Sequence, residues 1–137
     1  MYNDEQAADF IAQFCRNQVN VKRSLPIRSS DMGVMIYLSH HQKAKVKDVS
    51  DFFDVAGATV TEMIQRLEKS GMIVIHQDGQ DRRVKRIQLS DQGIRFVDET
   101  RVYYLDSIRS IRQTLGEADF ERFISLIQRI NESRVKP

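Results

Sequence analysis

The chain has 137 residues, of which 41% are hydrophobic and 29% charged, a balance typical of one folded domain and not of a disordered chain. No apolar run approaches the roughly 20 residues that span a bilayer, and the first ten residues are acidic where a secretory signal is basic. The single cysteine excludes an internal disulfide. We therefore expect a cytoplasmic protein that binds no membrane. The formal net charge is only +2, so the position of the basic residues matters more for nucleic-acid binding than their number.

Two helices are predicted at the start of the chain. In the first, residues recur at spacings of three and four, which places them on one helix face; they are Ala7, Phe10, Ile11, Phe14, Gln18 and Val21. This helix must end before Leu25-Pro26, because proline disfavours helical geometry at the residue before it. Ser29 or Ser30 can cap the next helix, which we expect to run from Asp31 to about His40.

Two short helices and a β-hairpin are predicted for the middle of the chain. A first short helix is indicated by Val46, Val49, Phe52 and Phe53, and a tight turn joins it to a second over residues 58–70 with Val60, Ile64 and Leu67 inward. Gly71 suits the left-handed position after a helix. The apolar run 72–75 and the alternating residues 84–89 then flank a turn-rich segment at 77–81, which is typical of a hairpin.

Two further helices are predicted to close the chain. Ser90 can cap the first. Its heptad-like seam is formed by Ile94, Val97, Arg101, Tyr104, Ile108, Ile111 and Leu115. Gly116 breaks the run, and a final helix is indicated by Phe120, Phe123, Ile124, Ile127 and Ile130.

The order of the middle elements favours DNA binding. Two short helices, a tight turn and a hairpin form a winged unit whose second helix can enter the major groove. On that helix the outward residues, placed for base edges or flanking backbone, are Ala58, Thr59, Thr61, Glu62, Gln65 and Arg66. The hairpin adds Arg82, Arg83, Lys85 and Arg86, and such side chains neutralise phosphates or enter a narrow minor groove. A helix-turn-helix rhythm or a basic hairpin alone is common without DNA binding, but their combination in this order favours it.

On these residues the chain resembles the MarR family of transcription regulators. Residues 78–93 follow that family's wing pattern, with its characteristic places taken by Asp81, Arg83, Leu89, Ser90, Asp91 and Gly93. Residues 59–61 and 66–71 match its recognition helix and the exit from it. The resemblance implies a mainly α fold with a small β-hairpin wing, in one domain: a winged helix-turn-helix unit over 29–90, with dimerisation helices over 1–28 and 91–137.

The resemblance also implies a mechanism. A homodimer would bind palindromic double-stranded DNA as a repressor or an activator, most simply as a repressor relieved by a small-molecule effector. Arg83 would enter the minor groove while Asp81 braces its guanidinium, and their spacing at a hairpin tip makes a bidentate contact possible. Candidate effector-pocket residues, between the dimer helices and the winged unit, are Phe14, Met32, Met35 and Tyr103.

Two departures from the family pattern bear on specificity. Residues 56–58 read Ala-Gly-Ala where the family usually has a capping Ser or Asp before the recognition helix, and a lost cap costs about 1 kcal/mol. Glu62 stands where a basic residue is frequent; its carboxylate is repelled by phosphates but can accept from cytosine N4. These departures leave open a winged-helix protein-interaction module without DNA binding.

Other chemistries find less support in the sequence. Cys15 could make the protein a thiol-based redox regulator, although a lone helical cysteine is more often inert packing. His40 and His41 are adjacent on a helix and therefore chelate poorly, with His76 a distant third ligand, so no metal or cofactor is expected. No nucleophile elbow, phosphate-binding glycine loop or metalloprotease motif is present, so an enzyme is not expected.

Overall fold

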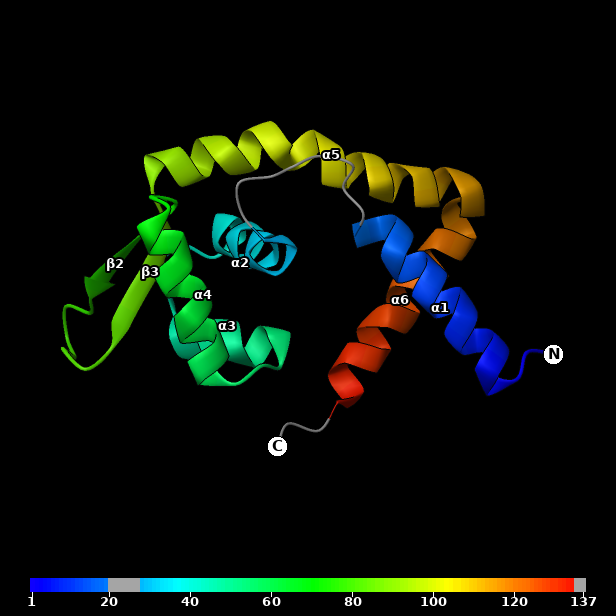
Figure 1. The fold of residues 1–137 in the computed structure, drawn as a ribbon, viewed down its shortest axis with the longest axis horizontal. Helices are drawn as coiled ribbons and strands as arrows, with labels where there is room; N and C mark the ends of the chain where they lie inside the picture. Colours follow the sequence, from blue (N-terminus) through cyan, green and yellow to red (C-terminus); the bar gives the residue numbers. More distant parts are fainter. Residues whose placement is uncertain (20–27, 135–137) are drawn as a thin grey trace.

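The computed structural model describes residues 1–19 and 28–134, and the elements within them follow the predicted order. They are α1 (Asp4–Val19), α2 (Ser29–His40), β1 (Ala44–Lys45), α3 (Val46–Phe53), α4 (Gly57–Lys69), β2 (Ile73–Gln77), β3 (Lys85–Leu89), α5 (Asp91–Leu115) and α6 (Glu117–Ser133). Figure 1 shows the long helix α5 spanning the molecule, with α2, α3, α4 and the strands at one end and α1 beside α6 at the other. Within the described ranges, no helix has the length and apolar character needed to cross a membrane.

The main core lies inside the winged unit. Its least exposed side chains come from α2, α3, α4, the sheet and the start of α5: Val34, Met35, Leu38, Val49, Val60, Leu67, Ile87 and Val97. The inward face predicted for α4 is confirmed, because Val60, Ile64 and Leu67 are all buried. Full burial of one such aliphatic side chain contributes roughly 1.5–3 kcal/mol, so this cluster fixes α4 against its neighbours.

The predicted hairpin is present and gains a third strand. β2 and β3 pair antiparallel from Ile73 opposite Leu89 to Gln77 opposite Lys85. The short strand β1 pairs with the other edge of β3, so the strand order is β1-β3-β2. Strand β1 could not be predicted, because two residues are too few to show the alternation of a strand.

The junction between the hairpin and α5 depends on close backbone contacts. The Ser90 hydroxyl accepts from the Gly93 backbone N–H at 3.0 Å, which confirms the predicted cap, and donates to the Gly71 carbonyl at 2.6 Å. A Cβ at Gly93 would lie 2.0 Å from the Met72 carbonyl oxygen, so only glycine fits this approach. Gly71 has a positive φ of 77°, as predicted for the residue after α4.

The predicted cap of α2 is wrong. The helix already begins at Ser29, and the cap position belongs to Arg28, which makes no side-chain capping bond. Asp31 in the first turn supplies the negative charge that a helix N-terminus favours. Because Asp31 is also held by an arginine of α4, a tertiary contact stabilises this helix start in place of a capping serine.

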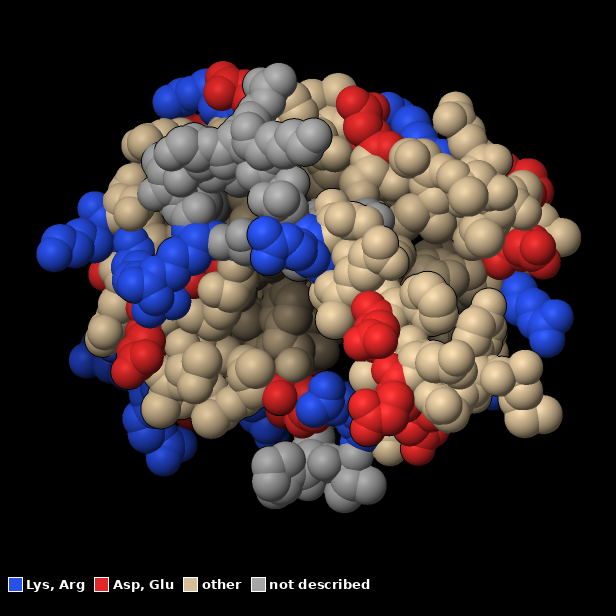
Figure 2. All heavy atoms as spheres, turned by 45° about the vertical axis from the view of Figure 1, so that its right-hand side comes forward, with Lys and Arg blue, Asp and Glu red and all other residues tan. Residues whose placement is uncertain are grey.

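The end opposite the winged unit exposes apolar side chains. α1 and α6 meet through Phe14 and Phe123, whose ring centroids lie 5.9 Å apart in an edge-on arrangement. Large apolar residues that stay exposed on α1, α6 and the second half of α5 include Phe10, Ile11, Ile108, Leu115, Ile124, Leu126, Ile127 and Ile130. In Figure 2 uncharged surface predominates on the side where α1 and α6 lie. Of the predicted first-helix face, Val21 lies outside the described residues.

Candidate nucleic-acid interface

The outward face of α4 is open to solvent. Ala58, Thr59, Thr61, Glu62 and Gln65 are all exposed, while the opposite face is buried in the core. The Thr61 hydroxyl donates to the Gly57 carbonyl at 2.9 Å, which fixes its rotamer near the helix start. An exposed polar face on a rigidly held helix is the arrangement that reads base edges in a major groove.

The start of α4 has the weak cap that the sequence predicts. Ala56 occupies the cap position and makes no side-chain hydrogen bond to the first turn. The Val60 N–H donates to the Ala56 carbonyl at 3.2 Å, so the helix hydrogen-bond ladder nevertheless begins there. The first-turn N–H groups that a Ser or Asp would cap are left for solvent or for an anionic partner such as a phosphate.

The wing carries an arginine held by a carboxylate. Arg83 donates from Nε to Asp81 Oδ1 at 3.1 Å and from Nη2 to Asp81 Oδ2 at 3.2 Å. The Arg83 backbone N–H also donates to Asp81 Oδ1 at 3.0 Å. The bidentate contact that the i, i+2 spacing makes possible is therefore present, yet the Arg83 side chain remains 91% exposed. The guanidinium is therefore both held in one orientation and accessible to a binding partner.

The base of the wing holds a second, less exposed arginine. Arg86 donates from Nε to Asp78 Oδ1 at 3.0 Å and from Nη1 to the Lys43 carbonyl at 3.1 Å. The other oxygen of Asp78 accepts from the backbone N–H groups of Gln80 and Asp81. Arg86 thus connects the hairpin to the loop after α2, a role that is not visible in the sequence.

These contacts lower the pKa of two wing aspartates. The pKa of Asp78 lies below its ordinary value chiefly because Arg86 donates to it, with the backbone N–H groups of Asp81 and Gln80 adding to the effect. The pKa of Asp81 is lowered chiefly by the Arg83 side chain and then by the Arg83 backbone N–H. Both carboxylates are therefore held as anions.

A pH titration of the wing follows from these shifts. Since the folded pKa is depressed, the stabilisation is present above the unfolded value of about 3.9 and is lost as the pH falls through the lower folded values. In carboxyl-carbon NMR we expect Asp78 and Asp81 to titrate below about pH 3.9. Arg86→Ala should move the Asp78 midpoint back up; an unchanged midpoint would show that the Arg86 contact is not made in solution.

Arg66, predicted to contact the DNA backbone, is engaged within the chain. It donates from Nε and Nη2 to the two oxygens of Asp31, at 3.0 and 2.9 Å. The Asp31 side chain is only 3% exposed and that of Arg66 35%. The hydrogen bond with Asp31 raises the pKa of Arg66 above its ordinary value. This pair couples α4 to α2 and so sets the position of α4.

Helix α4 and the hairpin border a common pocket. A pocket of about 220 Å³ is lined by Thr61, Gln65 and Glu68 of α4 and by Ile75, Lys85 and Ile87 of the hairpin, with Val46 and Ile64. The structure thus brings predicted contact residues of the helix and the wing together on one side of the winged unit. Arg82 is exposed beside Arg83 at the wing tip.

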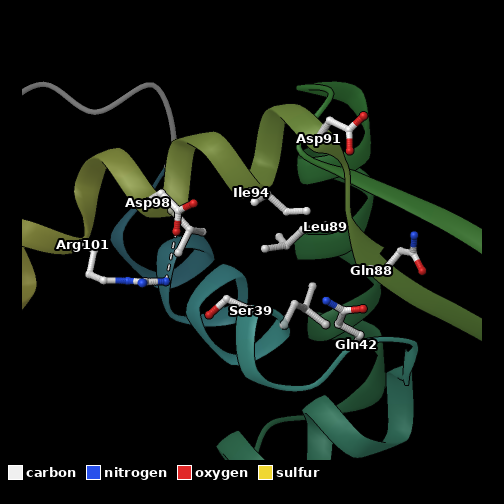
Figure 3. A pocket seen from close by; sticks show the side chains of 10 residues that line it. Ser39, Gln42, Gln88, Leu89, Asp91, Ile94, Asp98 and Arg101 are labelled. Carbon is white, nitrogen blue, oxygen red and sulfur yellow. Dashed lines mark ion pairs between the residues drawn. The ribbon is translucent and has the colours of Figure 1, made fainter.

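The four predicted effector-pocket residues lie in different surroundings. Met32 and Met35 are buried in the winged core, Phe14 contacts Phe123, and Tyr103 is 37% exposed on α5. None of them lines the pocket of about 200 Å³ between α2, β3 and α5. Figure 3 shows the ion pair of Asp98 and Arg101, 3.1 Å long, beside that pocket.

The fold and the basic wing define a winged helix-turn-helix protein. A family profile described as "Iron dependent repressor, N-terminal DNA binding domain" matches residues 35–80. Those residues run from within α2 to the hairpin turn. Within the part of the chain that the structure describes, no three His, Cys, Asp or Glu side chains are grouped to hold a metal ion.

The chain is similar to several known transcription regulators. The HTH-type transcriptional regulator MntR of Lysinibacillus sphaericus is 26% identical over 113 residues, which cover 73% of this chain and 80% of that protein. The structure of S. aureus MepR in complex with DNA superposes with a TM-score of 0.82 at 20% identity, covering 98% of this chain and 100% of MepR. The PcaV regulator of Streptomyces coelicolor, solved with its natural ligand, gives a TM-score of 0.80 at 21% identity over 96% of this chain and 93% of PcaV. Since MepR and PcaV are MarR-family regulators, the chain has the fold of that family, as the sequence predicted.

Proposed function

We propose that this chain is a sequence-specific double-stranded DNA-binding transcription regulator. The observation that carries the proposal is the Arg83 side chain, which is 91% exposed at the tip of the wing while Asp81 orients its guanidinium. A cation held in one orientation loses little conformational entropy on binding and suits the narrow minor groove. The exposed face of α4 is the element that would read the major groove. MepR, which shares the fold, was solved bound to DNA, and this supports the assignment.

The functional unit in this proposal is a homodimer. Its support is the set of large apolar side chains that α1 and α6 expose, since single soluble chains rarely leave wide apolar surfaces open. A two-fold dimer would present two winged units to an inverted repeat with half-site centres about one helical turn, or a small multiple of it, apart.

The dimer is tested by light scattering on the purified chain. We expect a mass near twice the 16.0 kDa of one chain. Ile11→Glu, at a side chain 63% exposed on α1, should raise the dimer dissociation constant at least roughly 10-fold by placing a charge in the apolar interface. Val74→Glu is the matched control, because Val74 is also exposed but lies on β2 in the wing. A wild-type monomer, or equal effects of the two substitutions, would rule out this interface.

The proposal includes control of DNA binding by a small molecule. The protein would act as a repressor that a small-molecule effector releases from DNA. The fold it shares with PcaV, a structure solved with its natural ligand, supports a ligand-responsive regulator. The pocket between α2, β3 and α5 supports the same view, because it lies where the winged unit meets the long helix α5.

Binding-site selection tests the proposed function. Duplexes with a randomised central segment are selected on the protein, and the recovered sequences are expected to converge on an inverted repeat. Recovery of no common sequence, together with stable capture of a protein partner, would favour the protein-interaction module. The weak cap at Ala56 and the exposed Glu62 are the features that favour this second candidate.

A further inference from the structure

A pocket opens inside the winged unit between α2, α3 and α4. Its volume is about 280 Å³, and its lining consists of Ser30, Gly33, Val34, Val49, Phe53, Val55, Val60 and Met63. Val34, Val49 and Val60 are at most 1% exposed and form its floor, while Phe53 is 37% exposed at its rim. The pocket is therefore open to solvent at one side and lined by core residues at the other.

The chemistry of this lining selects the ligand. Among the described residues that line the pocket, Ser30 alone has a polar side chain and none carries a charge. Water has few partners there, and an ionised ligand would lose its hydration without gaining a counter-charge. An engineered apolar cavity of about 150 Å³ stays dry and binds benzene, and drug-sized ligands need about 300 Å³ or more. The volume here falls between the two and fits a molecule of one or two rings.

We propose that this pocket binds one small, uncharged, apolar molecule of about the size of indole. Such a ligand would contact α2 at Val34, α3 at Val49 and α4 at Val60, and so would hold the recognition helix against the two helices beneath it. The site goes beyond the proposed function and does not depend on it, because ligand binding is measured without DNA.

Gly33 keeps the pocket open. A Cβ built on Gly33 would lie 3.7 Å from Phe53 Cε1 and 3.9 Å from Phe53 Cζ, which is ordinary van der Waals contact. A methyl group is therefore accommodated, whereas a longer side chain must extend into the space between α2 and Phe53. Gly33→Leu is the variant that fills the site from within, and Gly33→Ala fills it in part.

Indole is the probe, and methyl NMR of the full chain is the measurement. We expect saturable shifts of the Val34, Val49 and Val60 methyl groups, with a Kd on the order of 0.1–1 mM. Indole-3-carboxylate, which adds a charged carboxylate to the same ring system, should bind at least 10-fold more weakly. Gly33→Leu should also weaken indole binding at least 10-fold, whereas Gly79→Leu, at a glycine with open space around it, should leave binding unchanged.

Several outcomes of the indole experiment would overturn the proposal. Shifts without saturation, or shifts confined to Ile124 and Ile127 in the groove between α3 and α6, would place indole elsewhere. Equal indole binding by the Gly33→Leu and Gly79→Leu variants would also contradict the proposed site. So would equal affinities of the protein for indole and for indole-3-carboxylate. If Gly33→Leu does not fold, indole-induced shifts of the wild-type protein that leave the Val34, Val49 and Val60 methyl groups unmoved still count against the site.

Discussion

Replacing Arg83 with alanine is expected to lower the affinity for a selected DNA site by roughly 10- to 100-fold, since one well-placed arginine contact contributes about 1–3 kcal/mol. The side chain is 91% exposed and donates two hydrogen bonds to Asp81, so its loss removes a DNA contact that is already oriented. The slope of log affinity against log salt should also decrease by about one, because one fewer cation displaces counterions. Fluorescence anisotropy titrations at several salt concentrations measure both quantities.

Two further variants separate geometry from charge. Arg109→Ala removes the same charge from α5, where Arg109 pairs with Asp106, and should change affinity by less than about threefold. Asp81→Asn removes a negative charge near DNA, so charge alone predicts tighter binding, whereas loss of the brace on Arg83 predicts weaker binding. We expect weaker binding for Asp81→Asn. Arg83→Ala binding no worse than Arg109→Ala would remove the wing from the mechanism.

Replacing Arg66 with alanine is expected to lower the melting temperature on the order of 5–10 °C. The change leaves the Asp31 carboxylate, 3% exposed, without the two donors that now satisfy its oxygens. An unpaired buried carboxylate is costly, whereas Asp31→Ala leaves an arginine that can turn toward solvent. We therefore expect Arg66→Ala to destabilise the protein more than Asp31→Ala.

A double-mutant cycle shows whether the two residues act as a pair. The loss in the Asp31→Ala, Arg66→Ala double variant should be clearly smaller than the sum of the single losses. Arg101→Ala is the control, because its ion pair with Asp98 is largely exposed and should contribute little to the melting temperature. Additive single losses in differential scanning calorimetry would mean that the contact does not couple α2 to α4.

The periodic elements of this fold could be predicted from the sequence because each one carries its pattern locally. The buried face of α4, the cap at Ser90 and the pairing of Arg83 with Asp81 all involve residues a few positions apart. Such contacts depend on helix or hairpin geometry alone, which short-range spacing specifies.

The contacts that could not be predicted join residues distant in sequence. Arg66 meets Asp31 across 35 positions, and Arg86 meets the Lys43 carbonyl across 43. Both arginines look like free cations in the sequence, so both were expected to contact DNA, and only the packing of α2 against α4 and the hairpin reveals their partners. Met32 and Met35, candidates for the effector pocket, are buried in the core. Helical spacing cannot separate these two roles, because core residues and pocket residues can lie on the same face of a helix.

The affinity ratio between a selected inverted repeat and a scrambled duplex, measured by anisotropy at near-physiological salt, tests the central claim most directly. A sequence-specific regulator is expected to prefer its site by at least roughly 1000-fold and to lose affinity steeply as salt increases. Equal binding of the two duplexes, at the level of any basic protein, would contradict DNA-sequence recognition by this chain.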